Sequence, residues 1–344
     1  MRVSSGKMNK TGAKTADQKE AWVLVNVGTP DDPSTLSVRR YLSEFLNDPK
    51  VIDLPWLSRN LLVNLIIVPF RAPRSAKKYR WLWTEEGSPL LHHMNELVKK
   101  LQQLAGDRAD VFGAMRYGNP PLDELVDELE ESSYSSVTYL PLYPQWADST
   151  TGSVQQVIFG RVRTRTRIID QFYDHPGFLE CFAEIIQGHD PGSFDHVLFS
   201  YHGLPLRQIR KSHPEVPVQG CSCEKEMPSH GTYCYRAACF ATTRLLAEKC
   251  GIPGDRWSVA FQSRLSRNWM SPFTDERLVE LAENGKKRVL VVPASFVADC
   301  LETTLEIGHE YRELFLEAGG EELVMTESLN SSDKWAGVLY EILL

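Results

Sequence analysis

His202 is the first residue in this sequence whose type and place suit chemistry. It stands in Phe199-Ser-Tyr-His-Gly-Leu-Pro205, after an apolar run of strand length. Because proline cannot continue a central strand, we expect His202 at the carboxyl end of a buried strand. Ligands bind at that edge in open α/β sheets, and an imidazole takes a proton or binds a metal near neutral pH. A satisfied histidine in a loop is the alternative.

A series of glutamates spaced four apart forms a second candidate group. Glu302, Glu306 and Glu310 follow an expected strand at 287–295 and would share one face of a helix. Like charges at this spacing disfavour a helix unless a divalent ion or moving protons compensate them. A solvated face is the alternative, since further glutamates continue the series. Glu302 lies nearest the strand end and therefore nearest the cleft expected to hold His202.

Cysteines form a third group. Four of the seven lie close together, as Cys221, Cys223, Cys234 and Cys239. In a reducing compartment such a cluster indicates a metal site before a disulfide. Four thiolates suit tetrahedral zinc or an iron–sulfur cluster, and their spacing does not decide between the two.

Arginines and hydroxyls at strand ends are candidates for binding a ligand. Arg116 ends an expected strand beside Tyr117, and Arg71 ends an apolar stretch. Guanidinium groups at the rim of an apolar cleft suit ligand carboxylates. Ser149 and Ser263 would supply hydrogen bonds there.

The elements that carry these residues alternate between strands and helices, which predicts parallel sheets with covered faces. The second half of the chain repeats the plan of the first. The matching strands are 23–30 with 197–205, 110–116 with 258–263, and 135–143 with 287–295. We therefore expect an α/β protein of two similar doubly wound, Rossmann-like domains whose strand ends line one cleft. No Gly-x-Gly-x-x-Gly pattern follows Val27 or Ser200, so a dinucleotide site is unsupported.

The stretch 54–70 is apolar on nearly every face. It is either a buried helix or an exposed lip for an apolar ligand or a membrane surface.

Bulk properties narrow the class of protein. A chain of 344 residues suits two domains, and a net charge of −7 provides no broad basic field for nucleic acid. No uncharged apolar run is long enough for a membrane span. The polar residues 1–20 lack the core of a signal peptide, so we expect a disordered tail and a cytoplasmic protein.

Several motifs together give the sequence a specific resemblance. They are Leu24-Val-Asn-Val-Gly-Thr-Pro30, Met115-Arg-Tyr-Gly-Asn-Pro120, Tyr143-Pro-Gln-Trp, Ser149-Thr-Thr-Gly152, Ser200-Tyr-His-Gly-Leu-Pro205, Phe261-Gln-Ser-Arg264, Thr274-Asp-Glu276 and Glu302-Thr. From about residue 21 to its end the chain resembles the ferrochelatases, lyases that insert ferrous iron into a porphyrin to make haem.

The resemblance implies two doubly wound domains with parallel four-stranded sheets, a chelatase-like fold. The first would span 21–170 and carry a porphyrin-facing lip at 54–74. The second would span 171–321 and include the cysteine-rich segment 221–239. Residues 322–344 would pack back on the first domain.

The resemblance also implies roles for the candidate residues. His202 and Glu302 match the essential cleft pair, which binds metal or accepts pyrrole protons, and Glu306 and Glu310 match a polar lead for iron or protons. Residues that match those around the porphyrin and its propionates are Arg71, Tyr79, Arg116, Tyr117, Tyr143, Ser149 and Ser263.

The cysteine-rich segment resembles that of a bacterial subset with an internal [2Fe–2S] cluster, with Cys221, Cys223, Cys234 and Cys239 as ligands and zinc as the alternative. Iron(II) and protoporphyrin IX are the implied substrates. The implied lip would touch a membrane's inner face transiently, or an upstream enzyme that delivers porphyrin.

Three other interpretations remain open from the sequence. A sibling enzyme would use coproporphyrin III, whose four propionates require more cationic groups. A cobalt chelatase is disfavoured, because Val27 occupies the first-domain counterpart of His202. The third is an iron–sulfur redox or sensor protein.

Overall fold

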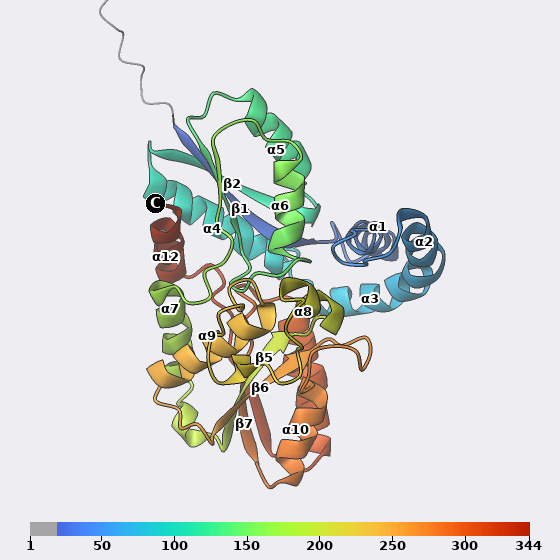
Figure 1. The fold of residues 1–344 in the computed structure, drawn as a ribbon, viewed down its shortest axis with the longest axis vertical. Coiled ribbons are helices and arrows are strands. Elements are labelled where there is room, and N and C mark those ends of the chain that lie inside the picture. Colours follow the sequence, from blue (N-terminus) through green and yellow to red (C-terminus); the bar gives the residue numbers. More distant parts are fainter. Residues whose placement is uncertain (1–18) are drawn as a thin grey trace, which may run out of the picture.

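Two α/β bodies make up the computed structural model, which describes residues 19–344 (Figure 1). The tail expected at 1–20 lies outside the described residues except for its last two positions. In Figure 1 the first body stands above the second, and the strands of both run toward the middle of the molecule.

The first sheet has four parallel strands in the order β2-β1-β3-β4. Both faces of β1 are buried: Trp22 and Leu24 face one apolar cluster, while Val23 and Val25 face another. The apolar runs of the sequence form these strands because helices cover both faces. Their bounds are β1 (Glu20–Thr29), β2 (Ala109–Gly118), β3 (Val137–Pro141) and β4 (Thr166–Ile168).

The second sheet repeats this arrangement with the order β6-β5-β7-β8. Taken in chain order, its strands occupy the same places as those of the first sheet. The repeat predicted from the sequence is therefore confirmed, as is the α/β fold with two parallel four-stranded sheets. The strands are β5 (His196–His202), β6 (Trp257–Gln262), β7 (Arg288–Val292) and β8 (Glu322–Met325).

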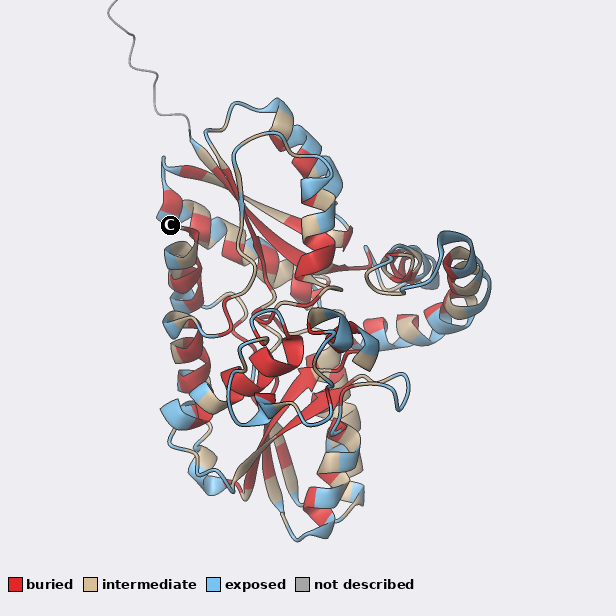
Figure 2. Cartoon of the chain, viewed as in Figure 1, coloured by how far each residue is buried: buried red, intermediate tan, exposed pale blue. Residues whose placement is uncertain are grey.

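Helices cover the sheets with their buried sides inward (Figure 2). Outside the arm described below, the α-helices are α4 (Pro89–Ala105), α5 (Leu122–Glu131), α6 (Thr151–Phe159), α7 (Pro176–Gly188), α8 (Leu206–Ser212), α9 (Tyr235–Lys249), α10 (Thr274–Glu283), α11 (Arg312–Glu317) and α12 (Asp333–Leu343). Two short 3₁₀ turns, η2 (Pro191–Ser193) and η3 (Ser222–Glu224), and a π-helix, η4 (Leu301–Tyr311), complete this set.

One apolar cluster joins the two bodies. It includes Leu24 of β1, Phe199 of β5, Phe178 of α7 and Trp335 of α12. The C-terminal segment 322–344 was expected to pack on the first domain. Its strand β8 instead pairs with β7 and completes the second sheet. The final helix, α12, packs against α4 and α7.

An arm projects from the first body, on the right in Figure 1. It consists of α1 (Thr35–Leu46), α2 (Trp56–Leu61), the π-helix η1 (Leu62–Ile67) and α3 (Val68–Leu82). Large apolar side chains on it are exposed, among them Trp56, Leu65 and Phe70 at 69%, 66% and 71%. Of the two interpretations of the stretch 54–70, the structure therefore supports the exposed lip.

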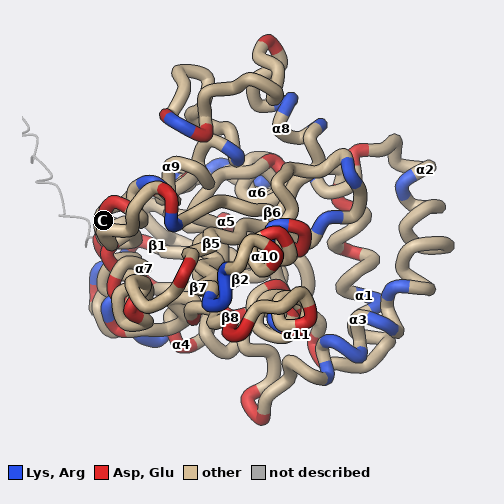
Figure 3. The backbone as a smooth tube through the Cα atoms, turned by 90° about the horizontal axis from the view of Figure 1, so that it is seen from below, with Lys and Arg blue, Asp and Glu red and all other residues tan. Residues whose placement is uncertain are grey.

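Basic side chains accompany these apolar ones. Figure 3 shows lysines and arginines along α3, and this helix carries no aspartate or glutamate. Within residues 19–344, no helix combines the length and the apolar character that crossing a bilayer requires.

Candidate active site between the two bodies

His202 ends β5, where the strand leaves the second sheet. Its backbone N–H donates to Ser295 Oγ at 3.4 Å, and its carbonyl oxygen accepts from the Tyr235 hydroxyl at 2.9 Å. The next residue must lack a side chain, because a Cβ on Gly203 would lie 2.8 Å from the carbonyl oxygen of Gln262. The predicted place of His202, at the carboxyl end of a buried strand, is confirmed.

Aromatic side chains flank the partly buried imidazole of His202. The ring centroids of Trp269 and Phe296 each lie 6.4 Å from that of the imidazole. The two rings restrict the directions in which the imidazole can point, while part of it stays accessible to a ligand.

Gln262 connects His202 to the glutamate series. The two residues are paired across β5 and β6, and Gln262 Nε2 donates to the carbonyl oxygen of Glu302 at 2.7 Å. Gln262 Oε1 accepts from Ser200 Oγ at 2.8 Å, which fixes the amide. The structure thus brings His202 and Glu302 to the same edge of the second sheet.

The predicted helix that carries Glu302, Glu306 and Glu310 is the π-helix η4. Hydrogen bonds from i to i+5 widen such a helix, and π-helical turns occur frequently at functional sites. A spacing of four fits α- and π-helices alike, so the sequence pattern did not distinguish them.

Glu302 faces the first body. The Cys300 thiol, Tyr41 and Tyr79 all lie near its carboxylate. Burial raises the pKa of both tyrosines well above the ordinary value, and the charge of Glu302 raises each further. Both phenols therefore stay protonated beside this carboxylate.

The other two glutamates are already engaged. Glu306 accepts from the backbone N–H of Ser263 at 2.9 Å, from Ser263 Oγ at 2.6 Å and from the Tyr311 hydroxyl at 2.7 Å. Ser263 holds this geometry with a left-handed backbone, at φ 60°. Glu310 pairs with Lys78 of the arm at 2.6 Å, and both side chains are over two-fifths exposed.

Arg116 and Tyr117 belong to a buried network around Asp48. Arg116 Nη2 donates to Asp48 Oδ2 at 2.5 Å, while its Nε donates to Ser153 Oγ at 2.7 Å. The Tyr117 hydroxyl donates to the same carboxylate oxygen at 2.9 Å. Asp48 is only 4% exposed, so its ion pair with Arg116 is buried inside the protein. The pair neutralises the charge of Arg116 there.

Aromatic side chains of the first body form the wall opposite η4. Tyr41 meets Tyr79 edge to face with ring centroids 6.3 Å apart, and Phe45 meets Tyr117 at 5.1 Å. Burial raises the pKa of Tyr143, which neighbours Tyr41. The structure thus gathers three of the predicted porphyrin residues around Tyr41.

Two further predicted residues lie at the margins. Arg71 is exposed near the start of α3, and its charge lowers the pKa of Tyr79, although burial outweighs that effect. Ser149 Oγ donates to Gln208 Oε1 at 3.2 Å, and Gln208 Nε2 donates to the carbonyl oxygen of Lys50. Ser149 therefore links the first body to α8.

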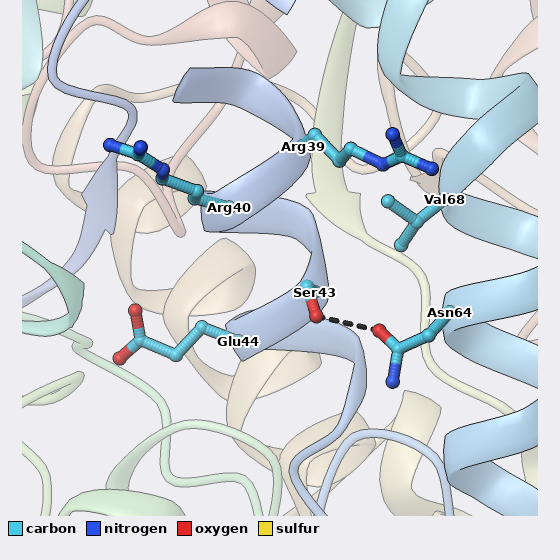
Figure 4. Close-up of a pocket in the computed structure, with 6 residues that line it drawn as sticks. All are labelled: Arg39, Arg40, Ser43, Glu44, Asn64 and Val68. Atoms are coloured by element: carbon cyan, nitrogen blue, oxygen red, sulfur yellow. Dashed lines mark hydrogen bonds between the residues drawn. The ribbon is translucent and has the colours of Figure 1, made fainter. Parts of the chain in front are cut away.

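A hollow of about 480 Å³ separates α1 from η1 and α3 (Figure 4). Ser43 Oγ donates to Asn64 Oδ1 at 2.6 Å across it, and Asn47 Nδ2 reaches the same oxygen at 3.2 Å. These bonds tie the π-helical part of the arm to α1. The predicted site residues do not line the hollow.

The cysteine segment lies between α8 and α9. Cys221 and Cys234 lie close enough to Cys223 to raise its pKa electrostatically, and Cys221 Sγ lies 3.3 Å from His230 Nε2. Burial is the larger cause and raises that pKa to about 12. Cys239 is fully buried on α9 and lies beside Cys234.

The four thiols of this segment are the type of donor that a four-sulfur site needs, and three of them are buried. Arg236 Nη1 donates to Cys223 Sγ at 2.6 Å, so a guanidinium group lies directly beside this sulfur. Within residues 19–344, no three ligand-type side chains already converge as a coordination sphere. The thiols would have to rotate to bind a shared group.

Sequence reasoning missed four residues that shape this site: Tyr41, Asp48, Gln262 and Tyr235. Tyr41 lies on the buried face of an amphipathic helix, which signalled burial but not the site. Gln262 belongs to the motif Phe261-Gln-Ser-Arg264, but that motif alone did not indicate its role. For Asp48 and Tyr235 the signal is absent, because their partners are distant in sequence.

Comparison with known proteins gives a consistent result. The sequence model of the family described as Ferrochelatase matches residues 19–344. The chain is 43% identical to the ferrochelatase of Pseudomonas entomophila (strain L48) over 331 residues, which cover 93% of this chain and 97% of that protein. It is 40% identical to the ferrochelatase of Coxiella burnetii (strain Dugway 5J108-111), over 92% and 91% of the two chains.

Solved structures show the same fold at low sequence identity. SirB from Bacillus subtilis, solved with Fe³⁺, has a TM-score of 0.52 at 11% identity and covers 94% of this chain and 93% of its own. A multi-domain protein of Deinococcus radiodurans with structural similarity to chelatases has a TM-score of 0.50 at 13% identity, over 95% of this chain and 55% of its own.

Proposed function

The chain belongs to the ferrochelatase family, and on that premise we propose that His202 and Glu302 form the pair at which iron enters the porphyrin. The family reaction is the insertion of ferrous iron into a porphyrin in haem synthesis. We further propose protoporphyrin IX as the substrate, held between the aromatic wall of the first body and η4.

The observation that carries this proposal is the bridge through Gln262. It holds Glu302 at the sheet edge where His202 ends its strand, while the Glu302 carboxylate faces Tyr41 and Tyr79 of the opposite body. A base and a carboxylate thus meet where the two bodies face each other. Sites in doubly wound folds form at such strand ends.

The chemistry requires a base at the ring centre. Two pyrrole N–H bonds break, iron(II) exchanges its water ligands for the four ring nitrogens, and two protons leave, so no electron is transferred. In our proposal His202 accepts the pyrrole protons and Glu302 attracts the incoming cation. Glu306 and Glu310 continue the path toward solvent, and their present partners Ser263 and Lys78 would release them in turn.

The small number of unpaired cationic side chains at the site favours a porphyrin with two propionates over one with four. Arg71 is exposed near the start of α3, whereas Arg116 is already paired with Asp48. Four carboxylates, as in coproporphyrin III, would need more free cations at the rim. Arg116 then serves mainly to orient Tyr117, whose ring lies 4.5 Å from the guanidinium carbon.

We also propose that Cys221, Cys223, Cys234 and Cys239 hold a [2Fe–2S] cluster. When bound, such a group would cross-link the segment between α8 and α9, because iron insertion itself is not a redox reaction. Arg236 and Glu224 close the segment on one side through an ion pair. Zinc on the same thiols is the alternative.

The arm fits transient contact with a membrane surface or with a protein that delivers porphyrin. Exposed apolar side chains on α2 and η1 adjoin the exposed basic residues Arg74 and Lys77 on α3. This combination suits the interface of an anionic bilayer.

An anaerobic assay of Fe(II) insertion tests the proposed pair and substrate. We expect wild type to metallate protoporphyrin IX, and His202→Ala and Glu302→Gln each to lower kcat at least about 100-fold. His189→Ala and Glu313→Gln are matched controls, because both residues lie outside the site, in partly exposed histidine–glutamate contacts. Turnover of coproporphyrin III in place of protoporphyrin IX would overturn the substrate, and active His202→Ala would overturn the pair.

A further inference from the structure

We propose that Tyr235 is a positioning residue for His202, and that it joins this proton acceptor to the cysteine segment. Its buried hydroxyl lies 2.9 Å from the carbonyl oxygen of His202. The inference rests on the proposed role of His202.

The end of β5 needs such a partner because a neighbouring strand has stopped. The ladder between β5 and β7 ends at the pair of Phe199 with Val292, whereas β6 continues to the pair of His202 with Gln262. On the β6 side the ladder carries on, since the N–H of Gly203 donates to the carbonyl oxygen of Gln262. The N–H and carbonyl of His202 itself therefore point to the side that β7 has left.

Ser295 and Tyr235 replace the missing strand. Ser295 Oγ accepts from the N–H of His202, and the Tyr235 hydroxyl donates to its carbonyl oxygen. Buried backbone groups need such partners, since leaving one unpaired costs free energy. These two side chains fix the peptide groups on either side of the imidazole.

Tyr235 is itself held firmly. It is the first residue of α9, is 7% exposed, and directly follows Cys234, the N-cap residue of the helix. Cys239, one turn further along α9, lies close enough to Tyr235 to raise the pKa of its hydroxyl, although burial is the larger cause. A shift of the cysteine segment would therefore reach the main chain of His202 through one side chain.

Such a contact matters because proton transfer depends on geometry. An error of about 1 Å in a reacting group can cost on the order of 100-fold in rate. Loss of the Tyr235 hydroxyl frees the carbonyl of His202 but leaves the imidazole and Glu302 in place. We therefore expect a smaller loss, in kcat and not in porphyrin binding.

The test compares Tyr235→Phe with Tyr201→Phe in the anaerobic insertion assay. Tyr201 is the matched control: it is fully buried on β5, and its hydroxyl bonds to Thr243 Oγ1 of the same helix α9 at 2.8 Å, whereas that of Tyr235 bonds to the carbonyl oxygen of His202. Both variants lose one buried hydroxyl hydrogen bond. We expect Tyr235→Phe to lower kcat about tenfold with KM for porphyrin within about twofold of wild type, and Tyr201→Phe to keep kcat within about twofold.

Either of two results would overturn the positioning role: wild-type kcat in Tyr235→Phe, or an equal loss in Tyr201→Phe at the same change in Tm. A different result, activity that remains in His202→Ala, would overturn the proposed role of His202 itself. In that case the loss in Tyr235→Phe has another origin.

A double-mutant cycle tests the link to the cysteine segment. We expect Cys239→Ala to lower kcat in wild type and to add nothing in Tyr235→Phe, because in our proposal the hydroxyl of Tyr235 connects the segment to the carbonyl of His202. Effects that multiply, or the absence of any effect of Cys239→Ala, would overturn the link.

Discussion

Among single residues, the three glutamates of η4 differ in surroundings although they share a spacing. Glu302 faces the opposite body beside the Cys300 thiol, Glu306 accepts three hydrogen bonds, and Glu310 forms an exposed pair with Lys78. Exposed ion pairs contribute little to stability, so Glu310 is the least constrained by the fold.

These surroundings predict a graded series. Glu302→Gln should lower kcat at least about 100-fold, Glu306→Gln about tenfold and Glu310→Gln less than about threefold. Steady-state kinetics at saturating porphyrin measure the series. Equal losses in the three variants would contradict separate roles.

His196, at the other end of β5, gives a pH dependence of stability. Burial lowers its pKa to about 4, so the folded state favours the neutral imidazole. As pH falls from about 6.5 to about 4, the unfolded state takes up a proton that the folded state refuses, and stability is lost. The loss from this residue should approach about 3 kcal/mol.

Urea unfolding at pH 7 and pH 4.5 checks this for wild type and His196→Gln. The variant starts less stable, because it loses the bond to Ser258 Oγ at 2.8 Å. It should nevertheless lose less stability over this interval than wild type. Parallel losses in the two proteins would assign the acid sensitivity elsewhere.

Among the elements, the cysteine segment is the one whose chemistry is visible in a spectrum. Purified anaerobically, the protein should contain about two iron and two sulfide per chain and absorb in the visible range. Cys223→Ser should remove both, whereas Cys250→Ser, outside the segment, should retain them. A colourless protein with about one zinc per chain would establish the alternative metal.

The arm is the element whose exposed face predicts a surface interaction. Leu65→Asp should weaken sedimentation of the protein with phosphatidylglycerol vesicles about tenfold, because a charge replaces an inserting side chain. Leu104→Asp is the control, since Leu104 is a similarly exposed leucine on α4, away from the arm. Equal effects of the two changes, or wild type that fails to bind vesicles, would contradict the membrane contact.

In the molecule as a whole, the repeat was predictable because each strand leaves the same pattern of apolar run and turn. Residues 23–30 and 197–205 share that pattern. They form β1 and β5, which hold the second place in the spatial order of their sheets. The place of His202 followed from it. A local pattern was sufficient there, because strand ends are determined by nearby residues.

Other features depend on contacts between distant segments. Asp48 reaches Arg116, and Lys78 reaches Glu310, without any periodicity that relates the partners. The predicted propionate role of Arg116 therefore could not include its neutralisation by Asp48. The π-helical form of η4 was also hidden, because glutamates four apart fit an α-helix equally well.

If His202 accepts the pyrrole protons, it must act on porphyrin that is already bound. A single-turnover experiment isolates that step: Fe(II) is mixed anaerobically with enzyme-bound protoporphyrin IX, and haem absorbance is followed in stopped flow. We predict that His202→Ala binds the porphyrin with a Kd within about twofold of wild type, while metallation slows at least about 100-fold. Metallation of bound porphyrin at the wild-type rate in His202→Ala would contradict the account.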